Sequence, residues 1–486
     1  MFTASIFSDL DITRRNVSKN LDPDRRLEFA QYMTPNSIAS FMSSLFTYGK
    51  KIKLIDPGAG IGSLTSAFLE SSLKHNSNVD VEAWEIDPSL IPYLESTINH
   101  WKKKSNGTIS YKIHSEDFID YASFLLGMGR DKYFTHAILN PPYKKINSQS
   151  KHRHLLSSIG IETVNLYSAF VALCISLLAD KGELVAIIPR SFCNGTYYLP
   201  FRKLILESTS IKQIHLFKSR NRAFSDDDVL QENIIIHLVK GADFNNVIIS
   251  TSLDAEFHDY AEHKCDYSSV VNQSSVNKFI HIPSNESEKY PPDICTNTLS
   301  EIGLEVSTGQ VVDFRAKEYL IKNITNKSIP LIYPFNYVDG KLIWPKEHKK
   351  PNALKMSSEI KNLLMPKGNY VLVKRFSSKE EKRRLVAFYL SPDNLDSDLI
   401  GFENHLNVFH LSKKGIDEYL ARGLTVFLNS TIIDQHFRVF SGHTQVNATD
   451  LRTIRYPSRE KLIKLGRKSL NSPNDQLSID NLIRNI

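Results

Sequence analysis

Cysteine, tryptophan and long apolar runs are scarce in this chain of 486 residues. Its four cysteines, at positions 174, 193, 265 and 295, are too scattered for a zinc knuckle or a disulfide framework, so we expect reduced thiols. No run of eighteen apolar residues occurs, and the first thirty residues lack the apolar core of a secretory signal. We therefore expect a cytoplasmic protein without a membrane span or a structural metal.

The net charge of +7 is unevenly spread. Residues 341–384 hold 13 Lys and Arg against 4 Asp and Glu. Such a run is usually a solvated face, and contact with a nucleic acid is the alternative. Patterns of strands and helices alternate up to about residue 290, and Pro, Lys and aromatic residues then become more frequent. We therefore place two domains at residues 1–288 and 289–486.

The most informative stretch is THAILNPPY, residues 135–143. It predicts a short apolar strand that ends at Asn140, because Pro141 and Pro142 cannot donate to a sheet. In this rigid loop the Asn140 amide oxygen and the Pro141 carbonyl are two acceptors at a fixed separation, and Tyr143 adds an aromatic face. Such groups suit a planar exocyclic amine. Hydrogen bonds to both amine hydrogens draw the nitrogen lone pair out of conjugation, so that it can attack a methyl donor.

A glycine-rich turn precedes this loop, in KIKLIDPGAGIGSL after a predicted strand at residues 52–55. Gly58 and Gly60 let a ligand approach the backbone, and the helix that follows favours a carboxylate at its N-terminus. The G-x-G-x-G spacing differs from the dinucleotide-binding pattern. Asp56 and Pro57 come directly before it, and an acid there repels a pyrophosphate but pairs with an ammonium group.

Two further strand ends carry acids. The strand in VDVEAWEID ends at Glu85 and Ile86, where doubly wound nucleotide-binding folds place the acid that binds ribose hydroxyls. The next unit, YKIHSEDFIDY, places Asp117 beside Phe118. Each acid taken singly is more often a helix cap. Farther along, His152 and His154 have no acidic or cysteine partner in sequence, so we interpret them as part of a solvated loop and expect no metal site.

In this order, the motifs resemble those of S-adenosylmethionine-dependent amino-methyltransferases, whose loop is (N/D/S)PP(Y/F/W), and the NPPY form is similar to the branch that modifies adenine N6. The resemblance implies S-adenosyl-L-methionine as cofactor, bound by Tyr32, Thr34, Asp56, Pro57, Gly58, Gly60, Glu85, Ile86, Asp117, Phe118 and Asn140. It implies catalysis by Asn140, Pro141, Pro142 and Tyr143, with Phe224 holding a flipped base against Tyr143, although Phe224 also suits a core position.

The C-terminal segments VSTGQVVDFR, VLVKRFSSKEEKRR and SGHTQVNATDLRTIRYP resemble the target-recognition half of type II restriction–modification adenine methylases, so the likeness runs from about residue 28 to 460. It implies double-stranded DNA as partner. We assign phosphate contacts to Lys374, Arg375, Arg383 and Arg384. Short polar side chains that suit base edges, or alternatively a hydrogen-bonded loop, are His443, Thr444, Gln445 and Asn447.

We therefore expect an α/β protein with a doubly wound, mostly parallel methyltransferase sheet and a mixed α+β C-terminal domain. Its expected activity is methylation of adenine N6 on a flipped base, as a monomer paired with a separate restriction endonuclease. The subgroup that it most resembles modifies CTGCAG. Two alternatives stay open: an RNA or protein-glutamine N-methyltransferase that uses the same loop, and a non-enzymatic DNA-binding module, although no motif here is broken.

Overall fold

The computed structural model describes residues 3–20, 33–218, 232–271, 276–283, 294–322, 324–325, 328–338, 340–377, 381–440, 445–471 and 475–485. The chain divides into two compact units, Met1–Glu286 and Ser287–Ile486. The expected boundary after residue 288 lies beside this division, and the separate functions of the two parts stay a prediction. Among the described helices, none has the length and apolar character needed to cross a membrane.

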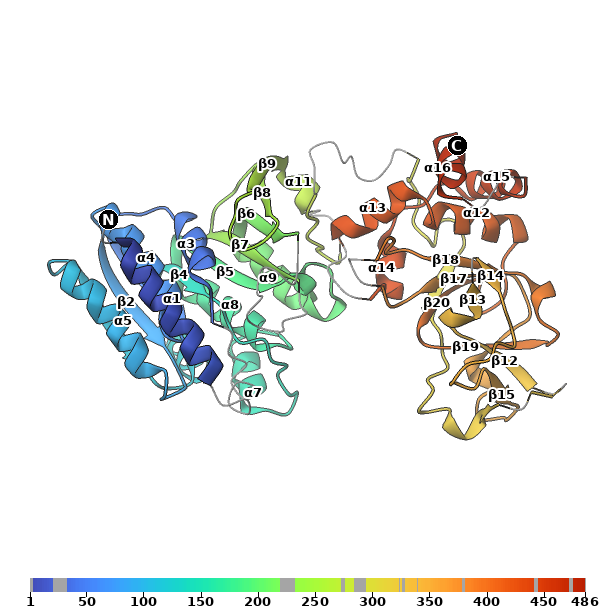
Figure 1. The fold of residues 1–486 in the computed structure, drawn as a ribbon, viewed down its shortest axis with the longest axis horizontal. Helices are drawn as coiled ribbons and strands as arrows, with labels where there is room; N and C mark the ends of the chain where they lie inside the picture. The colour runs from blue at the N-terminus through green and yellow to red at the C-terminus, as the bar shows by residue number, and fades with distance from the viewer. Residues whose placement is uncertain are drawn as a thin grey trace. The chain divides into compact units, whose positions relative to one another are not determined.

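The first unit is built on a nine-stranded sheet with the order β3-β2-β1-β4-β5-β7-β6-β8-β9 (Figure 1). Neighbouring strands from β3 to β5 are parallel, whereas β7 is antiparallel to β5 and β6 and β9 is antiparallel to β8. The expected doubly wound, mostly parallel sheet is confirmed. The strands are β1 (Lys51–Pro57), β2 (Asn78–Trp84), β3 (Ile109–His114), β4 (Phe134–Leu139), β5 (Leu178–Pro189), β6 (Thr209–Phe217), β7 (Asn233–Lys240), β8 (Asn246–Ser252) and β9 (Ala261–Asp266).

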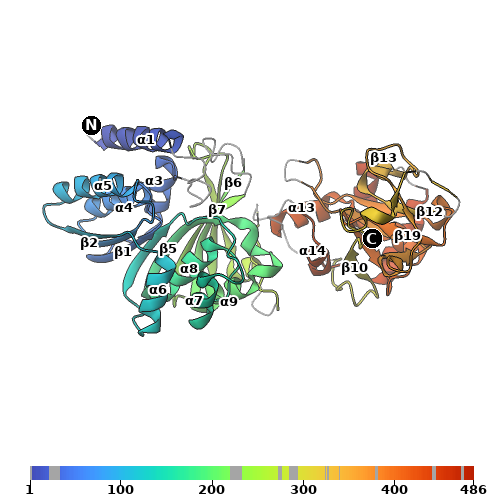
Figure 2. The same ribbon diagram turned by 90° about the horizontal axis from the view of Figure 1, so that it is seen from below.

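Helices cover both faces of this sheet (Figure 2). One face packs against α3 (Asn36–Ser44), α4 (Ser63–Lys74) and α5 (Ile91–Lys104), and the other against α6 (Phe118–Gly127), α7 (Lys151–Ser158), α8 (Leu166–Leu177) and α9 (Leu199–Ser208). Because successive strand side chains point to opposite faces, Ile138 joins the first apolar cluster while Ala137 and Leu139 join the second. Both faces of β4 are therefore buried, as its apolar sequence predicts.

The strand order reverses at β1, which has β2 on one side and β4 on the other. Pairing of Leu54 with His136 and of Ile55 with Ala137 brings the carboxyl ends of β1 and β4 side by side. Ligands of doubly wound sheets bind at such a reversal. The turn after β1 has positive φ at three glycines, and a Cβ on Gly62 would lie 2.9 Å from Leu94 Cδ1 of α5.

The second unit is a mixed α+β structure, as expected. It contains a four-stranded sheet of order β10-β20-β17-β18, a five-stranded sheet of order β11-β15-β12-β19-β16 and the β13-β14 pair. These strands are β10 (Glu305–Thr308), β11 (Leu320–Ile321), β12 (Ser328–Ile332), β13 (Tyr337–Val338), β14 (Lys341–Leu342), β15 (Ala353–Lys355), β16 (Leu364–Pro366), β17 (Tyr370–Lys374), β18 (Ala387–Leu390), β19 (Leu399–Phe402) and β20 (Leu406–His410). Its α-helices are α12 (Glu418–Leu428), α13 (Thr431–Phe440), α14 (Ala448–Thr453), α15 (Arg459–Ser469) and α16 (Gln476–Arg484).

One segment of the first unit differs from the sequence-based expectation of a solvated loop around His152 and His154. The polar segment after the NPPY loop is not a continuous loop, because its second half forms α7. Ser150 starts this helix by accepting a hydrogen bond from the Arg153 N–H, a local signal that a polar composition conceals.

Helices α12 and α15 of the second unit meet through glycines. A Cβ on Gly423 would lie 1.8 Å from the Leu462 carbonyl oxygen, and a Cβ on Gly466 would lie 1.8 Å from the Tyr419 carbonyl oxygen. Each obstacle is backbone, which cannot rotate away as a side chain does. The two helices therefore pack backbone to backbone, and each glycine is required by this distance.

We expect Gly466→Ala to destabilise the second unit by about 1–3 kcal/mol, because the added methyl forces these helices apart. Urea unfolding monitored by circular dichroism measures the change. Gly127→Ala is the matched control, because its Cβ meets no heavy atom within 4 Å at the end of α6 and should have a neutral or slightly stabilising effect. Equal midpoints for wild type and Gly466→Ala would contradict the packing argument.

Candidate functional site

A pocket lies at the carboxyl ends of β1, β2 and β4 in the first unit. Most of the residues predicted to bind the cofactor line it together: Thr34, Gly58, Gly60, Glu85, Ile86, Asp117, Phe118 and Asn140. Pro142 also lines it. Tyr32 and Phe224 lie outside the described residues. Sequence segments that are more than a hundred residues apart therefore converge on one cavity, because the reversal of strand order brings the strand ends together.

The NPPY loop is held from two sides. The Asn140 side-chain N–H donates to Thr34 Oγ1 at 3.0 Å, and the Tyr143 hydroxyl lies 3.0 Å from both Asn140 Oδ1 and the Ile187 carbonyl oxygen. A hydroxyl has one proton, so Tyr143 donates to one of these acceptors at a time. These contacts orient the Asn140 amide, with its nitrogen toward Thr34 and its oxygen toward Tyr143. Pro141, between them, is buried.

Glu85 ties the end of β2 to the glycine-rich turn after β1. Its carboxylate accepts hydrogen bonds from the backbone N–H groups of Gly60 and Asp87, both at 2.8 Å, and the residue is 5% exposed. Burial raises the pKa of Glu85 to about 6, while these N–H groups favour the charged form. The acid predicted to bind ribose hydroxyls thus also fixes the shape of the pocket wall.

Asp56 does not line the pocket, and neither does Pro57. Asp56 is fully buried and accepts a 2.5 Å hydrogen bond from the Thr65 hydroxyl of α4. Burial raises its pKa to about 7, against the effect of the Thr65 hydrogen bond. The structure therefore gives Asp56 an anchoring contact between β1 and α4, and its predicted pairing with an ammonium group stays a prediction.

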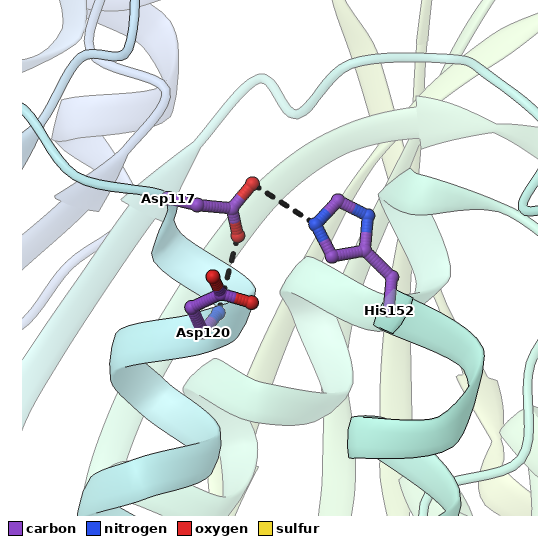
Figure 3. A group of neighbouring side chains, drawn as sticks. All are labelled: Asp117, Asp120 and His152. Atoms are coloured by element: carbon purple, nitrogen blue, oxygen red, sulfur yellow. Dashed lines mark hydrogen bonds and ion pairs between the residues drawn. The ribbon is translucent and has the colours of Figure 1, made fainter. Parts of the chain in front are cut away.

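Asp117, Asp120 and His152 form a hydrogen-bonded group at the pocket rim (Figure 3). Asp117 caps α6 by accepting from the backbone N–H groups of Ile119 and Asp120, and His152 Nε2 lies 3.0 Å from Asp117 Oδ2. The expectation that His152 has no acidic partner is wrong, because α7 carries it back to α6. His152 also lines the pocket, whereas His154 is exposed.

Charges in this group are mutually compensated. Burial raises the pKa of Asp117, but the hydrogen bond from His152 and the capping N–H groups outweigh it and bring that pKa below its ordinary value. The hydrogen bond to Asp117 raises the pKa of His152, and Lys151 pairs with Asp120. Ligand atoms of the three residues lie within 4.8 Å of one another, as metal ligands do. These distances do not require a metal ion, because the hydrogen bond between His152 and Asp117 and the ion pair of Lys151 with Asp120 also hold the three residues together.

The remaining wall is apolar. Phe118 and Phe170 lie with ring centroids 5.0 Å apart, and Ile86, which also lines the pocket, is exposed. A flat apolar slot with the Glu85 and Asp117 carboxylates at its edges fits a purine nucleoside, whose ring stacks while its amine and hydroxyls donate. The residues present therefore fit S-adenosylmethionine.

Sequence reasoning missed part of this wall. Helix α1 (Thr3–Asn20) packs Leu10 and Val17 against a small apolar cluster of Met33, Ile61 and Leu90, all three of which line the pocket. The N-terminal segment therefore supports the pocket, although its polar composition suggested no role. Phe170 was missed because it lies on a helix that is apolar all round, where nothing distinguishes a pocket residue from a core residue.

The basic residues of the second unit divide into two groups. Arg384 is 1% exposed, and Arg383 donates to the Ser430 carbonyl and to Gln476. Burial of Arg384 contradicts its predicted phosphate contact. Arg383 is partly exposed and joins elements of its own unit, and its phosphate contact stays a prediction. Lys374 is partly exposed and pairs with Glu381 at 2.9 Å. It stays a candidate for a phosphate contact.

The predicted base-reading segment is also divided. Asn447 caps α14 in a reciprocal arrangement with Asp450. This contact agrees with the alternative prediction that the segment is a hydrogen-bonded loop. Gln445 is partly exposed and accepts a hydrogen bond from Arg375 at 3.3 Å. His443 and Thr444 fall outside the described residues.

Comparison with known proteins agrees with this geometry. Residues 32–224 match the family described as Eco57I restriction-modification methylase. The chain is 48% identical to Type II methyltransferase M.BsuBI of Bacillus subtilis, covering 95% of this chain and 94% of that one. It is 41% identical to Type II methyltransferase M.PstI of Providencia stuartii, covering 98% and 96%. A cryo-EM structure of a DrdV–DNA complex shares the fold, with a TM-score of 0.53 at 11% identity over 96% of this chain and 60% of that one.

We expect His152→Ala to weaken binding of S-adenosylmethionine about 2- to 10-fold, because Asp117 loses a hydrogen bond that orients it. The loss should depend on pH. The pKa of His152 is raised above its ordinary value of 6.5. The attraction between charged His152 and Asp117 is therefore fully present below pH 6.5 and is lost as the pH rises through the raised pKa. Calorimetric titrations from pH 5.5 to 9 should show wild type converging on the variant at high pH. His154→Ala, on the same helix but exposed, is the control that should match wild type throughout.

Proposed function

Because the chain belongs to the type II methyltransferases of restriction–modification systems, which methylate DNA with S-adenosylmethionine, we propose that it methylates N6 of adenine at one specific DNA site. The observation that carries this proposal is the NPPY loop, whose Asn140 amide is oriented by Thr34 and Tyr143 beside the nucleoside pocket. The modification protects DNA from a cognate endonuclease, and we propose that a separate chain supplies that nuclease while this chain acts as a monomer.

In this mechanism the cofactor supplies an electrophilic methyl group. Asn140 Oδ1 and the Pro141 carbonyl accept the two hydrogens of the adenine amine, so that its lone pair leaves conjugation and points at the methyl carbon. Thr34 keeps the Asn140 amide from rotating, which prevents the amide nitrogen from presenting a donor where an acceptor is needed. In this direct displacement the nitrogen–methyl bond would form as the sulfur–methyl bond breaks, S-adenosylhomocysteine would be the leaving group, and the surplus nitrogen proton would pass to water.

An amine inside a duplex cannot reach this loop, so the target base must be extruded. Extrusion costs a few kcal/mol, which stacking on the Tyr143 ring and contacts to phosphates offset. The Tyr143 hydroxyl donates to Asn140 Oδ1 or to the Ile187 carbonyl, and this hydrogen bond fixes the plane of the Tyr143 ring before the base arrives. We assign the second face of the base to Phe224.

Target recognition belongs, in this proposal, to residues 289–486. Lys374 contacts phosphate, and a short polar segment around Gln445 contacts bases. The proposed site is CTGCAG, which the resemblance to the subgroup implies. The nearly full-length likeness to two type II methyltransferases supports DNA as the substrate over the RNA and protein-glutamine alternatives.

We expect Asn140→Ala to lower kcat for methylation at least about 10²- to 10³-fold, because the variant loses an acceptor that acts only as the amine is attacked. Cofactor affinity should change no more than a few-fold, since the remaining pocket wall is unaltered. Tritium transfer to plasmid DNA and calorimetry with S-adenosylmethionine measure the two quantities. Asn78→Ala, at an exposed position at the start of β2, is the control. Retained transfer by Asn140→Ala would contradict the assigned role.

Single-molecule sequencing of plasmid DNA from cells that express the chain tests the whole proposal. We expect N6-methyladenine at one short site, with complete modification. N4-methylcytosine at a specific site would replace the base assignment while preserving the enzyme class. Modification at scattered adenines would contradict a dedicated recognition domain, and unmodified DNA would favour the RNA or protein alternative.

A further inference from the structure

Three loop segments of the second unit converge where β17 ends and β20 begins, strands that lie side by side in Figure 1. The Arg375 N–H donates to the His405 carbonyl at 2.8 Å, and the Val446 N–H donates to the Arg375 carbonyl at 2.7 Å. Phe376 and Gln445 are bridged in the same antiparallel manner. We call the side chains Arg375, Phe376, His405 and Gln445 the donor edge. Their backbone is fixed by main-chain hydrogen bonds, which is unusual for loops and suits recognition.

Arg375 is held in one plane. Its Nη1 donates to the Asn404 carbonyl at 3.1 Å and its Nη2 donates to Gln445 Oε1 at 3.3 Å. Each terminal nitrogen of a guanidinium carries a second hydrogen, so these two bonds leave further donors on a side chain whose orientation is set. A phosphate contact needs only a mobile point charge, whereas a fixed guanidinium suits bidentate contact with a base.

The Gln445 amide orientation follows from this contact. A guanidinium has no acceptor, so the atom that faces Arg375 must be the amide oxygen. The amide nitrogen, with its two hydrogens, therefore points away from Arg375. Arg375 and Gln445 both present donors, and among the base edges of the major groove only guanine offers two adjacent acceptors, N7 and O6.

Aromatic rings flank these donors. Phe376 is 38% exposed and lies 4.8 Å from the His405 ring, centroid to centroid. Glu403, which is buried, orients His405 by accepting from both its ring Nδ1 and its backbone N–H. The acid next to the donor edge is thus turned inward, and the surface offers an incoming anionic polymer donors and an apolar face, within a segment of positive net charge.

We propose that Arg375 and Gln445 form the element that recognises a guanine of the target site through its major-groove N7 and O6. This inference rests on the proposed function, because it assigns a base to the reader of that same enzyme. It reassigns Arg375 from phosphate contact to base readout and adds Phe376 and His405 as the flanking surface.

The test uses the full chain and 30-base-pair duplexes that contain the site found by sequencing. Initial methylation rates and DNA affinities are measured for the native duplex and for duplexes in which each guanine in turn is replaced by 7-deazaguanine, which lacks the N7 acceptor. For wild type, we expect one guanine at which the replacement lowers affinity about 5- to 100-fold. Arg375→Lys should lose a similar factor on the native duplex and should become indifferent to that one replacement, while it keeps its sensitivity elsewhere.

Gln445→Glu should also lose discrimination at this guanine or at its neighbour, because it replaces a donor by an acceptor. Arg455→Lys is the matched control, since Arg455 is an exposed arginine of the same unit whose nearest acid is 4.0 Å away. Its sensitivity to every replacement should equal that of wild type. Circular dichroism melts confirm that the variants are folded.

Two outcomes would overturn the inference. Either Arg375→Lys keeps the wild-type pattern of sensitivity, as a phosphate contact that lysine can also make predicts, or its affinity falls equally on all duplexes, including those with 7-deazaguanine at the sensitive position. Failure of the proposed function has a different signature, because wild type itself would then methylate no duplex. The affinity measurements judge the donor edge independently of turnover.

Discussion

The parallel pairing of β1 with β4 is the constraint on which the site depends. Two adjacent register pairs, Leu54 with His136 and Ile55 with Ala137, set the glycine-rich turn and the NPPY loop at the same height on the sheet edge. A shift by one residue would turn every side chain of β4 to the opposite face and bury polar groups in both apolar clusters. The hydrophobic layers on either side therefore protect the geometry of the loop, whose Tyr143 packs against one of them.

Polar groups in the pocket have two tasks each. Glu85 holds the Gly60 turn, and Asp117 caps α6, before either contacts a ligand. A buried carboxylate without partners is costly, and backbone N–H groups supply the partners here. The same bonds keep the acids oriented, so the cofactor meets a preformed wall instead of ordering it on binding. Asp56 differs, because in the core its Oδ2 accepts from Thr65 while its buried Oδ1 accepts no hydrogen bond from the described residues.

In the second unit, some of the positive charges serve packing. Arg384 is buried, whereas Arg383 and Arg375 are partly exposed and each donates to groups of its own unit. A guanidinium satisfies several acceptors at once, so arginine suits the joints between irregular segments. The local excess of Lys and Arg consequently overstates the positive charge that the surface of this unit exposes.

The sequence by itself determined the chemistry of the first unit, because NPPY, the glycine-rich turn, Glu85 and Asp117 sit at strand ends that the alternation of strands and helices predicts. It also indicated two domains and a mixed second one. Only the tertiary structure brought His152 to Asp117, put α1 against the pocket wall and separated the buried Arg384 from the partly exposed Arg375. Local patterns encode strand ends and turns, but contacts between distant segments depend on how whole layers pack, and no run of neighbouring residues contains that information.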